Sequence, residues 1–270
     1  MSDLGADAIL VQDLGLLSVL KKAVPDIPLH ASTQMSIHNL AGVEAAAEMG
    51  LTRAVLAREL SFEQIKFITK HSPIETEIFV HGALCFCHSG QCYMSSLIGR
   101  RSGNRGMCAQ PCRLPYGVNE KASGGHPLSL KDANLSAYLQ ELDDMGVACL
   151  KLEGRMKRPE YVAVITGIYR RLLDEKRAPT QEESRQLEAA FSRSGFTDGY
   201  YRGRTGPEMF GTRPENAPEP KELFARAKAA YEKEDRRRIP VTMSCTLRAG
   251  VPAQLTASAK GHTVPAEGPV

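Results

Sequence analysis

The sequence predicts an α/β fold, a TIM-barrel-like (β/α)8 domain that is N-terminally truncated to about six β-α units. Short apolar segments alternate with helical stretches through the first two thirds of the chain, which indicates a parallel sheet covered by helices. No glycine-rich phosphate fingerprint follows any predicted strand, and polar residues recur at strand ends, so a barrel fits better than an open dinucleotide-binding sheet. Only six strands are visible, and the first begins near Met1, so a closed barrel would lack its first two strands.

The six predicted strands cover residues 8–11, 27–30, 54–57, 77–81, 127–130 and 147–152. Helical spacing follows most of them, and caps mark several ends. Ser36 is expected to open the second helix and Gly50 to follow its end, while Ser61 and Gln64 have capping-box spacing. Pro159 is placed to begin the helix after the sixth strand.

Three segments are expected along the chain. Residues 1–202 form the barrel domain, with a cysteine-rich insertion at 82–118, and residues 203–219 form a linker rich in Gly and Pro. Residues 220–270 begin with a charged helix and continue into a hairpin at 241–247 and 253–257. Two strands are rarely stable alone, so this is interpreted as an incomplete C-terminal domain.

Composition narrows the class of protein. The net charge of +3 is too small to indicate a nucleic-acid or membrane partner by itself. No apolar run is long enough to span a bilayer, and the N-terminus lacks the basic start of a signal peptide, so a cytoplasmic protein without membrane contact is expected. Seven cysteines, five of them close together in a long chain of this kind, favour a metal over disulfides.

Four cysteines are the candidate metal ligands: Cys85, Cys92, Cys108 and Cys112, separated by six, fifteen and three residues. Structural zinc sites commonly use two tight pairs, so this spacing favours an iron-sulfur cluster, with zinc and buried unreactive thiols as alternatives. Cys87 is interpreted as lying near the metal without binding it. Cys149 is the alternative to Cys112 as the fourth ligand.

The cysteine-rich insertion is also basic. It carries Arg100, Arg101, Arg105 and Arg113, and no acidic residue lies between Gly82 and Val118. RNA contact is one explanation. Compensation of a negatively charged cluster and a solvated charged loop are the others.

Polar residues after the predicted strands complete the candidate site, because strand ends of a parallel barrel meet at one face. The expected substrate-binding residues are His30, Gln34, Arg58, Lys131 and Arg155. Glu59 and Glu153 are the candidate general acid or base. The alternatives are helix caps and salt bridges at the barrel rim, and capping is favoured for Asp132.

A family resemblance rests on the segment Glu77-x-Phe79-x-x-Gly82-Ala83-Leu84-Cys85 followed by Gly90-x-Cys92-x-Met94-Ser95. It resembles the signature of the peptidase U32 family, or collagenase-like proteases. Further blocks support it: residues 12–15, 30–34, 57–60, 129–132, 151–155 and 195–200. The tail from about Pro220 resembles the extra domain of a clostridial-type subgroup.

The resemblance implies two kinds of activity. Some members are assigned collagen degradation, and others are oxygen-independent hydroxylation proteins acting on ribosomal RNA cytidine, transfer RNA uridine or ubiquinone. The latter bind a 4Fe-4S cluster through cysteines, and the RNA-modifying ones depend on prephenate. By this resemblance Cys85 and Cys92 match the signature cysteines, and Cys108 with Cys112 match the pair that follows.

Hydroxylation of an RNA base is the favoured function, with an electron-transfer partner. A protease needs an activated nucleophile or a metal-bound water, and the chain has neither an H-E-x-x-H nor a G-x-S-x-G motif. A thiolate-imidazole pair of Cys85 or Cys92 with His81 or His88 keeps a collagenase-like peptidase as the alternative. A zinc-stabilised RNA-binding module is the third interpretation.

Overall fold

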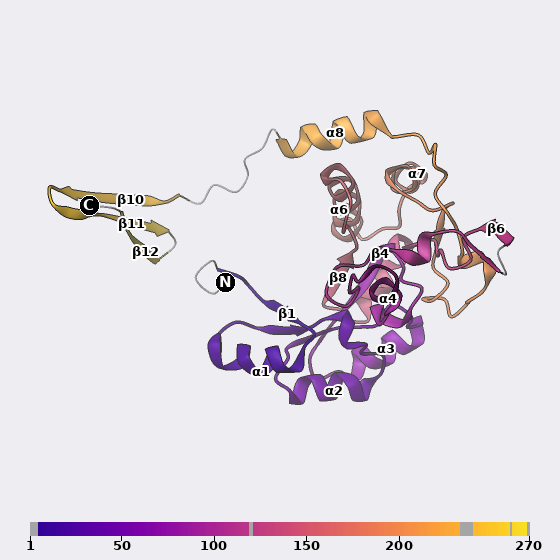
Figure 1. Ribbon diagram of the computed structural model, residues 1–270, viewed down its shortest axis with the longest axis horizontal. Helices are drawn as coiled ribbons and strands as arrows, with labels where there is room; N and C mark the ends of the chain where they lie inside the picture. The colour runs from indigo at the N-terminus through magenta and orange to yellow at the C-terminus, as the bar shows by residue number, and fades with distance from the viewer. Residues whose placement is uncertain (1–4, 119–120, 233–239, 260, 269–270) are drawn as a thin grey trace. The chain divides into compact units, whose positions relative to one another are not determined.

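The computed structural model describes residues 5–118, 121–232, 240–259 and 261–268 of the 270-residue chain. The chain divides into two compact units, residues 1–227 and 228–270 (Figure 1). The first unit has an α/β architecture and contains all the residues predicted to form the functional site.

The first unit is organised around a seven-stranded sheet. Its strands are β1 (Ile9–Val11), β2 (Leu29–Ala31), β3 (Arg53–Val55), β4 (Glu75–Ala83), β7 (Asp132–Asn134), β8 (Cys149–Leu152) and β9 (Phe196–Thr197). The first four strands are parallel and adjacent in chain order. On its other side β4 pairs parallel with β8 and, nearer its end, antiparallel with β7, which in turn pairs parallel with β9. The predicted parallel sheet is therefore present, with one antiparallel pair.

Eight α-helices lie in the described part of the chain. They are α1 (Leu14–Ala23), α2 (Leu40–Glu48), α3 (Phe62–His71), α4 (Met94–Gly99), α5 (Leu139–Asp144), α6 (Pro159–Asp174), α7 (Gln181–Ala190) and α8 (Lys221–Glu232). Among them α2 contacts α3, and α6 contacts both α5 and α7 (Figure 1).

Local signals set most helix ends. The capping box of Ser61 and Gln64 begins α3, and Pro159 begins α6, as predicted. The second helix does not open at Ser36, which has φ +56; it begins at Leu40, where the Asn39 side chain accepts a hydrogen bond from the Gly42 N–H. Asn39 therefore satisfies an N-terminal N–H group that has no partner within the helix.

The core lies between this sheet and its helices. The buried face of α6 has helical spacing: Tyr161, Val164, Ile165, Ile168 and Leu172 are each at most 7% exposed. Burying one such aliphatic side chain contributes about 1.5–3 kcal/mol. This packing fixes the start of α6, where β8 leads into the helix.

The fifth predicted strand, residues 127–130, is wrong. Leu130 forms a single antiparallel bridge with Phe210, and the Lys131 N–H donates to the Met209 carbonyl, so this segment pairs with residues far along the chain. The strand that joins the sheet is β7, which begins at Asp132.

Residues 203–219, predicted as a linker, pack on the first unit. Met209 is 2% exposed, and a Cβ on Gly211 would lie 2.3 Å from the Arg193 carbonyl oxygen. Such a close approach requires glycine, because nothing larger fits against backbone. The segment is therefore part of the same folded unit as the sheet.

The second unit contains an antiparallel sheet of β10 (Thr242–Arg248), β11 (Val251–Ala259) and β12 (His262–Glu267). The predicted hairpin is confirmed, and β12 adds a third strand.

A separate antiparallel pair in the first unit, β5 (Tyr116–Val118) and β6 (Lys121–Gly125), follows the last cysteine of the insertion. Within the described residues no helix has the length and apolar character that a bilayer crossing requires.

Candidate functional site

The cysteine-rich insertion lines a cavity of about 210 Å³. All four candidate ligands, Cys85, Cys92, Cys108 and Cys112, are among its lining residues. Ala83 and Leu84, where β4 ends, form another part of the wall, together with Glu153 and Arg155, which follow β8. The carboxyl ends of two parallel neighbours and the predicted metal ligands therefore meet at one place.

Arg113 fixes the last part of the insertion to the sheet. One guanidinium nitrogen donates to the Leu130 carbonyl (2.5 Å) and the Ser129 hydroxyl (3.1 Å), and the other donates to the Leu84 carbonyl (2.5 Å). Burial, and then the nearby Arg193, lower the pKa of Arg113. This arginine acts as a structural anchor rather than as an exposed RNA contact.

Glu59 holds the first part of the insertion. Its carboxylate accepts hydrogen bonds from the Ser89 N–H (2.7 Å) and the Ser89 hydroxyl (2.8 Å). Ser89 is fully buried and has φ +40, so this turn between Cys87 and Cys92 needs outside support. Glu59, predicted as a catalytic residue, is thus engaged in positioning the cysteines.

The thiols influence one another. Burial raises the pKa of Cys112, and the neighbouring thiols of Cys85, Cys108 and Cys92 raise it further, although Arg113 opposes them. Burial likewise raises the pKa of Cys87, as do Cys85 and Cys92. None of the seven cysteines forms a disulfide. In the described part of the chain no three His, Cys, Asp or Glu side chains are arranged to hold a single metal ion.

Cys149, the other candidate for the fourth ligand, lies elsewhere. It is the first residue of β8 and is paired in register with Glu77. Burial and then Glu77 raise its pKa. Cys112 lines the cysteine cavity and Cys149 does not, which supports Cys112 as the fourth ligand.

Arg58 and Glu153 form an ion pair across the end of the sheet. The Nη2 to Oε2 distance is 3.3 Å, and both side chains are mostly buried. The guanidinium also lies 4.0 Å from the centroid of the Phe79 ring, and the Glu153 Oε1 accepts the Arg155 N–H at 2.8 Å. The buried Arg58 Nε has no hydrogen-bond partner. Arg58, predicted as a substrate-binding residue, and Glu153, predicted as a general acid or base, are therefore joined on the cavity wall.

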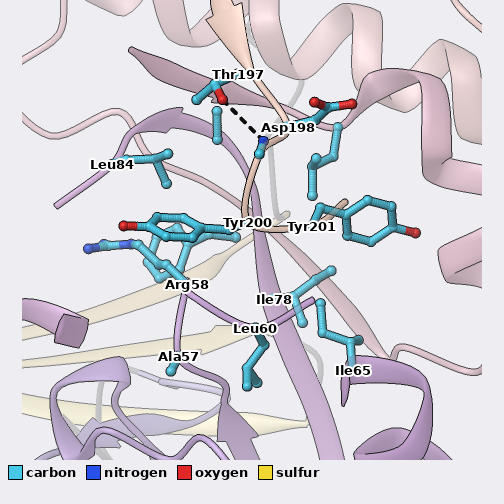
Figure 2. A pocket seen from close by; sticks show the side chains of 14 residues that line it. Ala57, Arg58, Leu60, Ile65, Ile78, Leu84, Thr197, Asp198, Tyr200 and Tyr201 are labelled. Atoms are coloured by element: carbon cyan, nitrogen blue, oxygen red, sulfur yellow. Dashed lines mark hydrogen bonds between the residues drawn. The ribbon is translucent and has the colours of Figure 1, made fainter. Parts of the chain in front are cut away.

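A second, much smaller cavity of about 30 Å³ adjoins Arg58. Figure 2 shows the guanidinium of Arg58 and the ring of Tyr200 pointing to the same side, with Leu84 nearby. Burial raises the pKa of Tyr200, and Glu59 and Cys85 raise it further. Tyr200, from the Gly195–Tyr200 block, is a residue that the sequence analysis did not assign to the site.

Gln34 is where the prediction placed it. It lines the cysteine cavity, and its side-chain amide donates to the Gly103 carbonyl at 3.3 Å. The Gln34 carbonyl in turn accepts from the Gln91 side chain. Gln34 therefore also supports the insertion from the side of β2.

His30 does not belong to the cysteine cavity. It lies within β2, not after it, and lines a separate cavity of about 870 Å³ with Arg53 and Glu75, which begin β3 and β4. Burial and then Arg53 lower its pKa. His30 lies here because it is inside the strand, which ends at Ala31, one residue later than expected.

Lys131 is also absent from the cysteine cavity wall. It precedes β7, and its side chain packs beside Gly211, where an added Cβ would lie 2.6 Å from the Lys131 Cγ. Backbone hydrogen bonds join residues 129–131 to residues 209–211, and this pairing brings the Lys131 side chain against Gly211. Asp132, for which capping was favoured, instead lies in β7 and pairs with Arg193 at 2.5 Å.

Lys157 is the cation that the sequence analysis missed. It lines the cysteine cavity, and burial lowers its pKa to about 7, helped by Arg193, Arg213 and Arg113 against Asp132. Met156, with φ +62, separates it from Arg155. The signal was the basic residue two places beyond Arg155 in the same strand-to-helix turn.

Comparison with known protein families shows which family the chain belongs to. The model of the family described as peptidase family U32 matches residues 1–210. The chain belongs to this family. Its sequence is 44% identical over 175 residues to the Escherichia coli 23S rRNA 5-hydroxycytidine C2501 synthase, covering 63% of this chain and 26% of the relative.

Other relatives within the family carry different names. The Helicobacter pylori tRNA hydroxylation protein P is 38% identical over 219 residues, covering 74% of this chain and 52% of the relative. A Porphyromonas gingivalis collagenase is 35% identical over 202 residues, covering 66% of this chain and 48% of the relative. The chain thus spans about a quarter to a half of these U32 proteins. No solved structure matches it.

Proposed function

We propose that this U32 chain holds a 4Fe-4S cluster on Cys85, Cys92, Cys108 and Cys112 and contributes to oxygen-independent hydroxylation of an RNA base. One hydroxylation relative is named for a ribosomal RNA cytidine and another for transfer RNA, and the family resemblance makes a uridine the candidate base in transfer RNA. The observation that carries the proposal is the presence of these four thiols on one cavity, beside Arg58 and Glu153.

The donor set fits a cluster better than a single ion. Four thiolates are the usual ligands of a 4Fe-4S cluster, in which each sulfur binds a different iron. A tetrahedral zinc ion instead draws its ligand atoms to about 2.0–2.3 Å from one centre. The spacing of six, fifteen and three residues, without two tight pairs, also favours a cluster over the zinc-stabilised RNA-binding module.

When bound, the cluster would supply the redox chemistry, and the surrounding residues would handle substrate and protons. Arg155 and Lys157 are suited to bind carboxylate or phosphate groups, including a carboxylate cosubstrate such as prephenate. Glu153 is the proposed general acid or base, since it lies on the cavity wall and Arg58 orients its carboxylate. Glu59 positions the cysteine turn.

A TIM-barrel-like (β/α)8 arrangement remains part of the proposal. It is supported by the parallel series β1 to β4 and by the cavity at the carboxyl ends of β4 and β8, which is where barrel enzymes bind substrates. An electron-transfer partner would be needed to reduce the cluster.

A collagenase-like peptidase is the second candidate, because one U32 relative is named a collagenase. The predicted thiolate-imidazole pair finds little support. The His81 Nδ1 lies 3.1 Å from the Tyr169 hydroxyl and its buried Nε2 has no hydrogen-bond partner, while the His88 ring packs edge-on against His38. Burial lowers the pKa of His81 to about 3, so it is a poor base at neutral pH.

The test is anaerobic purification followed by determination of iron, acid-labile sulfide and zinc. Iron and sulfide are expected in equal amounts, and Cys92→Ala is expected to lose the visible cluster absorbance while the matched control Cys245→Ala, in the second unit, keeps it. Mass spectrometry of RNA nucleosides should then show one hydroxylated base missing when the gene is deleted. Zinc without iron, or full absorbance in Cys92→Ala, would refute the cluster.

A further inference from the structure

A basic cavity, different from the small one beside Arg58, adjoins the cysteine cavity. Its volume is about 260 Å³, and its wall is formed by the start of α6, the end of α7 and residues 213–224. Lys157, Arg158 and Arg213 supply its cations, and Phe191 and Phe224 supply aromatic rings. All these residues belong to the first unit.

The cations are held against the rings. The Lys157 Nζ lies 2.7 Å and the Arg213 Cζ 4.5 Å from the Phe191 ring centroid, and the Arg158 Cζ lies 5.4 Å from that of Phe224. Cation-π contacts orient such groups, although they leave the charge uncompensated.

Acidic partners are scarce in this cavity. Glu219 is the acid on its wall, and it pairs with Arg158. Among the described residues, neither Lys157 nor Arg213 has a carboxylate within ion-pair distance. Lys157 and Arg213 are like charges held against the same Phe191 ring, so they repel each other, and an anion bound beside them would stabilise the arrangement.

The two cavities share a wall. Met156 and Lys157 line both, and the Met156 side chain is 82% exposed. The φ of +62 at Met156 is uncommon for a residue with a side chain, and this residue separates Arg155, which lines the cysteine cavity, from Lys157, which lines both cavities. A ligand with several linked groups would therefore reach both cavities at once.

We propose that the cavity of Lys157, Arg213 and Phe191 binds a backbone phosphate of single-stranded RNA, next to the nucleotide whose base enters the cysteine cavity. The inference rests on the proposed RNA substrate and adds a phosphate subsite to it. Guanidinium and ammonium groups are the usual phosphate partners, and contact with a neighbouring phosphate fixes which base is presented. A polynucleotide supplies anionic groups at the regular intervals that two adjoining cavities require.

The test is fluorescence anisotropy with a short labelled single-stranded RNA and the full chain, repeated at several salt concentrations. Arg213→Gln and Lys157→Met are each expected to weaken binding by about tenfold, as for loss of a charged hydrogen bond. Each should also reduce the slope of log K against log salt by about 0.7. The control is Arg170→Gln on α6, which removes one exposed charge that pairs with Asp174 and should change neither quantity.

The outcomes separate this inference from the proposed function. If wild type binds RNA but both variants match Arg170→Gln, the phosphate subsite is refuted while an RNA substrate stands. If wild type binds no RNA, the proposed substrate itself fails. Inorganic phosphate is expected to displace RNA more strongly than chloride does at equal ionic strength, and this difference should be lost in Arg213→Gln; equal displacement by the two anions would overturn the phosphate subsite.

Discussion

Gly82 is the residue of the signature segment whose replacement should cost the most stability. Its φ is +105, and a Cβ there would lie 2.6 Å from the Glu153 carbonyl oxygen and 2.9 Å from the Glu153 Cβ. The backbone cannot yield easily, because the Glu153 N–H donates to the His81 carbonyl at 2.9 Å and so holds the ends of β4 and β8 together. Gly82→Ala therefore strains two strands at the edge of the cysteine cavity.

The expected loss has two parts. A positive φ at a residue with a Cβ costs about 1–2 kcal/mol, and forcing an extra methyl group into packed structure costs about 1–3 kcal/mol. Gly82→Ala should thus lower the free energy of unfolding by about 2–5 kcal/mol, a large share of the roughly 5–15 kcal/mol typical of a protein. It should also displace Glu153 from Arg58.

Two other glycines separate these parts. Gly146 has φ +86 but nothing within 4 Å of an added Cβ, so Gly146→Ala should show only the backbone cost of about 1–2 kcal/mol. Gly99, in α4, has neither constraint, and Gly99→Ala should be neutral or stabilise by up to about 1 kcal/mol. Urea unfolding of the three variants measures the midpoint and slope. Equal losses for Gly82→Ala and Gly146→Ala would refute the close approach of β4 and β8.

Three further predictions concern single contacts. Hydrogen bonds from Arg177 hold the pKa of Glu183 well below its usual range, so the stability that this carboxylate contributes is complete at neutral pH and is lost as the pH falls below about 4. Glu183→Gln should lower the free energy of unfolding by about 1–3 kcal/mol at neutral pH. The same difference between variant and wild type in acid would contradict this. Folding lowers the pKa of Lys157 from 10.5 to about 7, so between these pH values the unfolded chain binds more protons than the folded chain, and the stability rises with pH. Urea unfolding should therefore show Lys157→Met to be more stable than wild type at roughly pH 6. This difference in the free energy of unfolding should shrink towards pH 10. A double-mutant cycle of Glu59→Gln and Ser89→Ala, followed by hydrogen exchange in the insertion, should give a coupling of about 1–2 kcal/mol, and additive effects would show that the two residues do not act together.

The parts of the fold that follow from local chemistry were predictable. The strands β1 to β4, the capping box at Ser61 and the helix start at Pro159 depend on residues within a few positions of one another. The failures depend on distant contacts. No local signal distinguishes a strand at residues 127–130 from a segment that bridges to Phe210, and a Gly/Pro-rich stretch has the same composition whether it is a linker or is packed like Met209.

The site shows the same limit. Clustering along the chain and the family resemblance brought the four cysteines together as candidates, and in the structure they line one cavity. The partners of the strand-end charges were not predictable, because Arg58 pairs with Glu153, 95 positions away, while its sequence neighbour Glu59 binds Ser89. His30 was misplaced because it lies inside β2, paired in register with Arg53, and not beyond the end of the strand.

Charge balance explains why an anion should bind where it is proposed. Along the sheet each cation has an acid: Arg53 lies 2.6 Å from Glu75, and Lys151 lies 3.0 Å from Glu77. The last such pair is Arg58 with Glu153, at the cavity. After the end of β8 the cations lack acidic partners: among the described residues no carboxylate lies within ion-pair distance of the side chains of Arg155, Lys157 and Arg213. Arg155 is exposed and Lys157 and Arg213 are half-buried, so these like charges repel one another without stabilising the fold, and a negatively charged ligand would offset that repulsion.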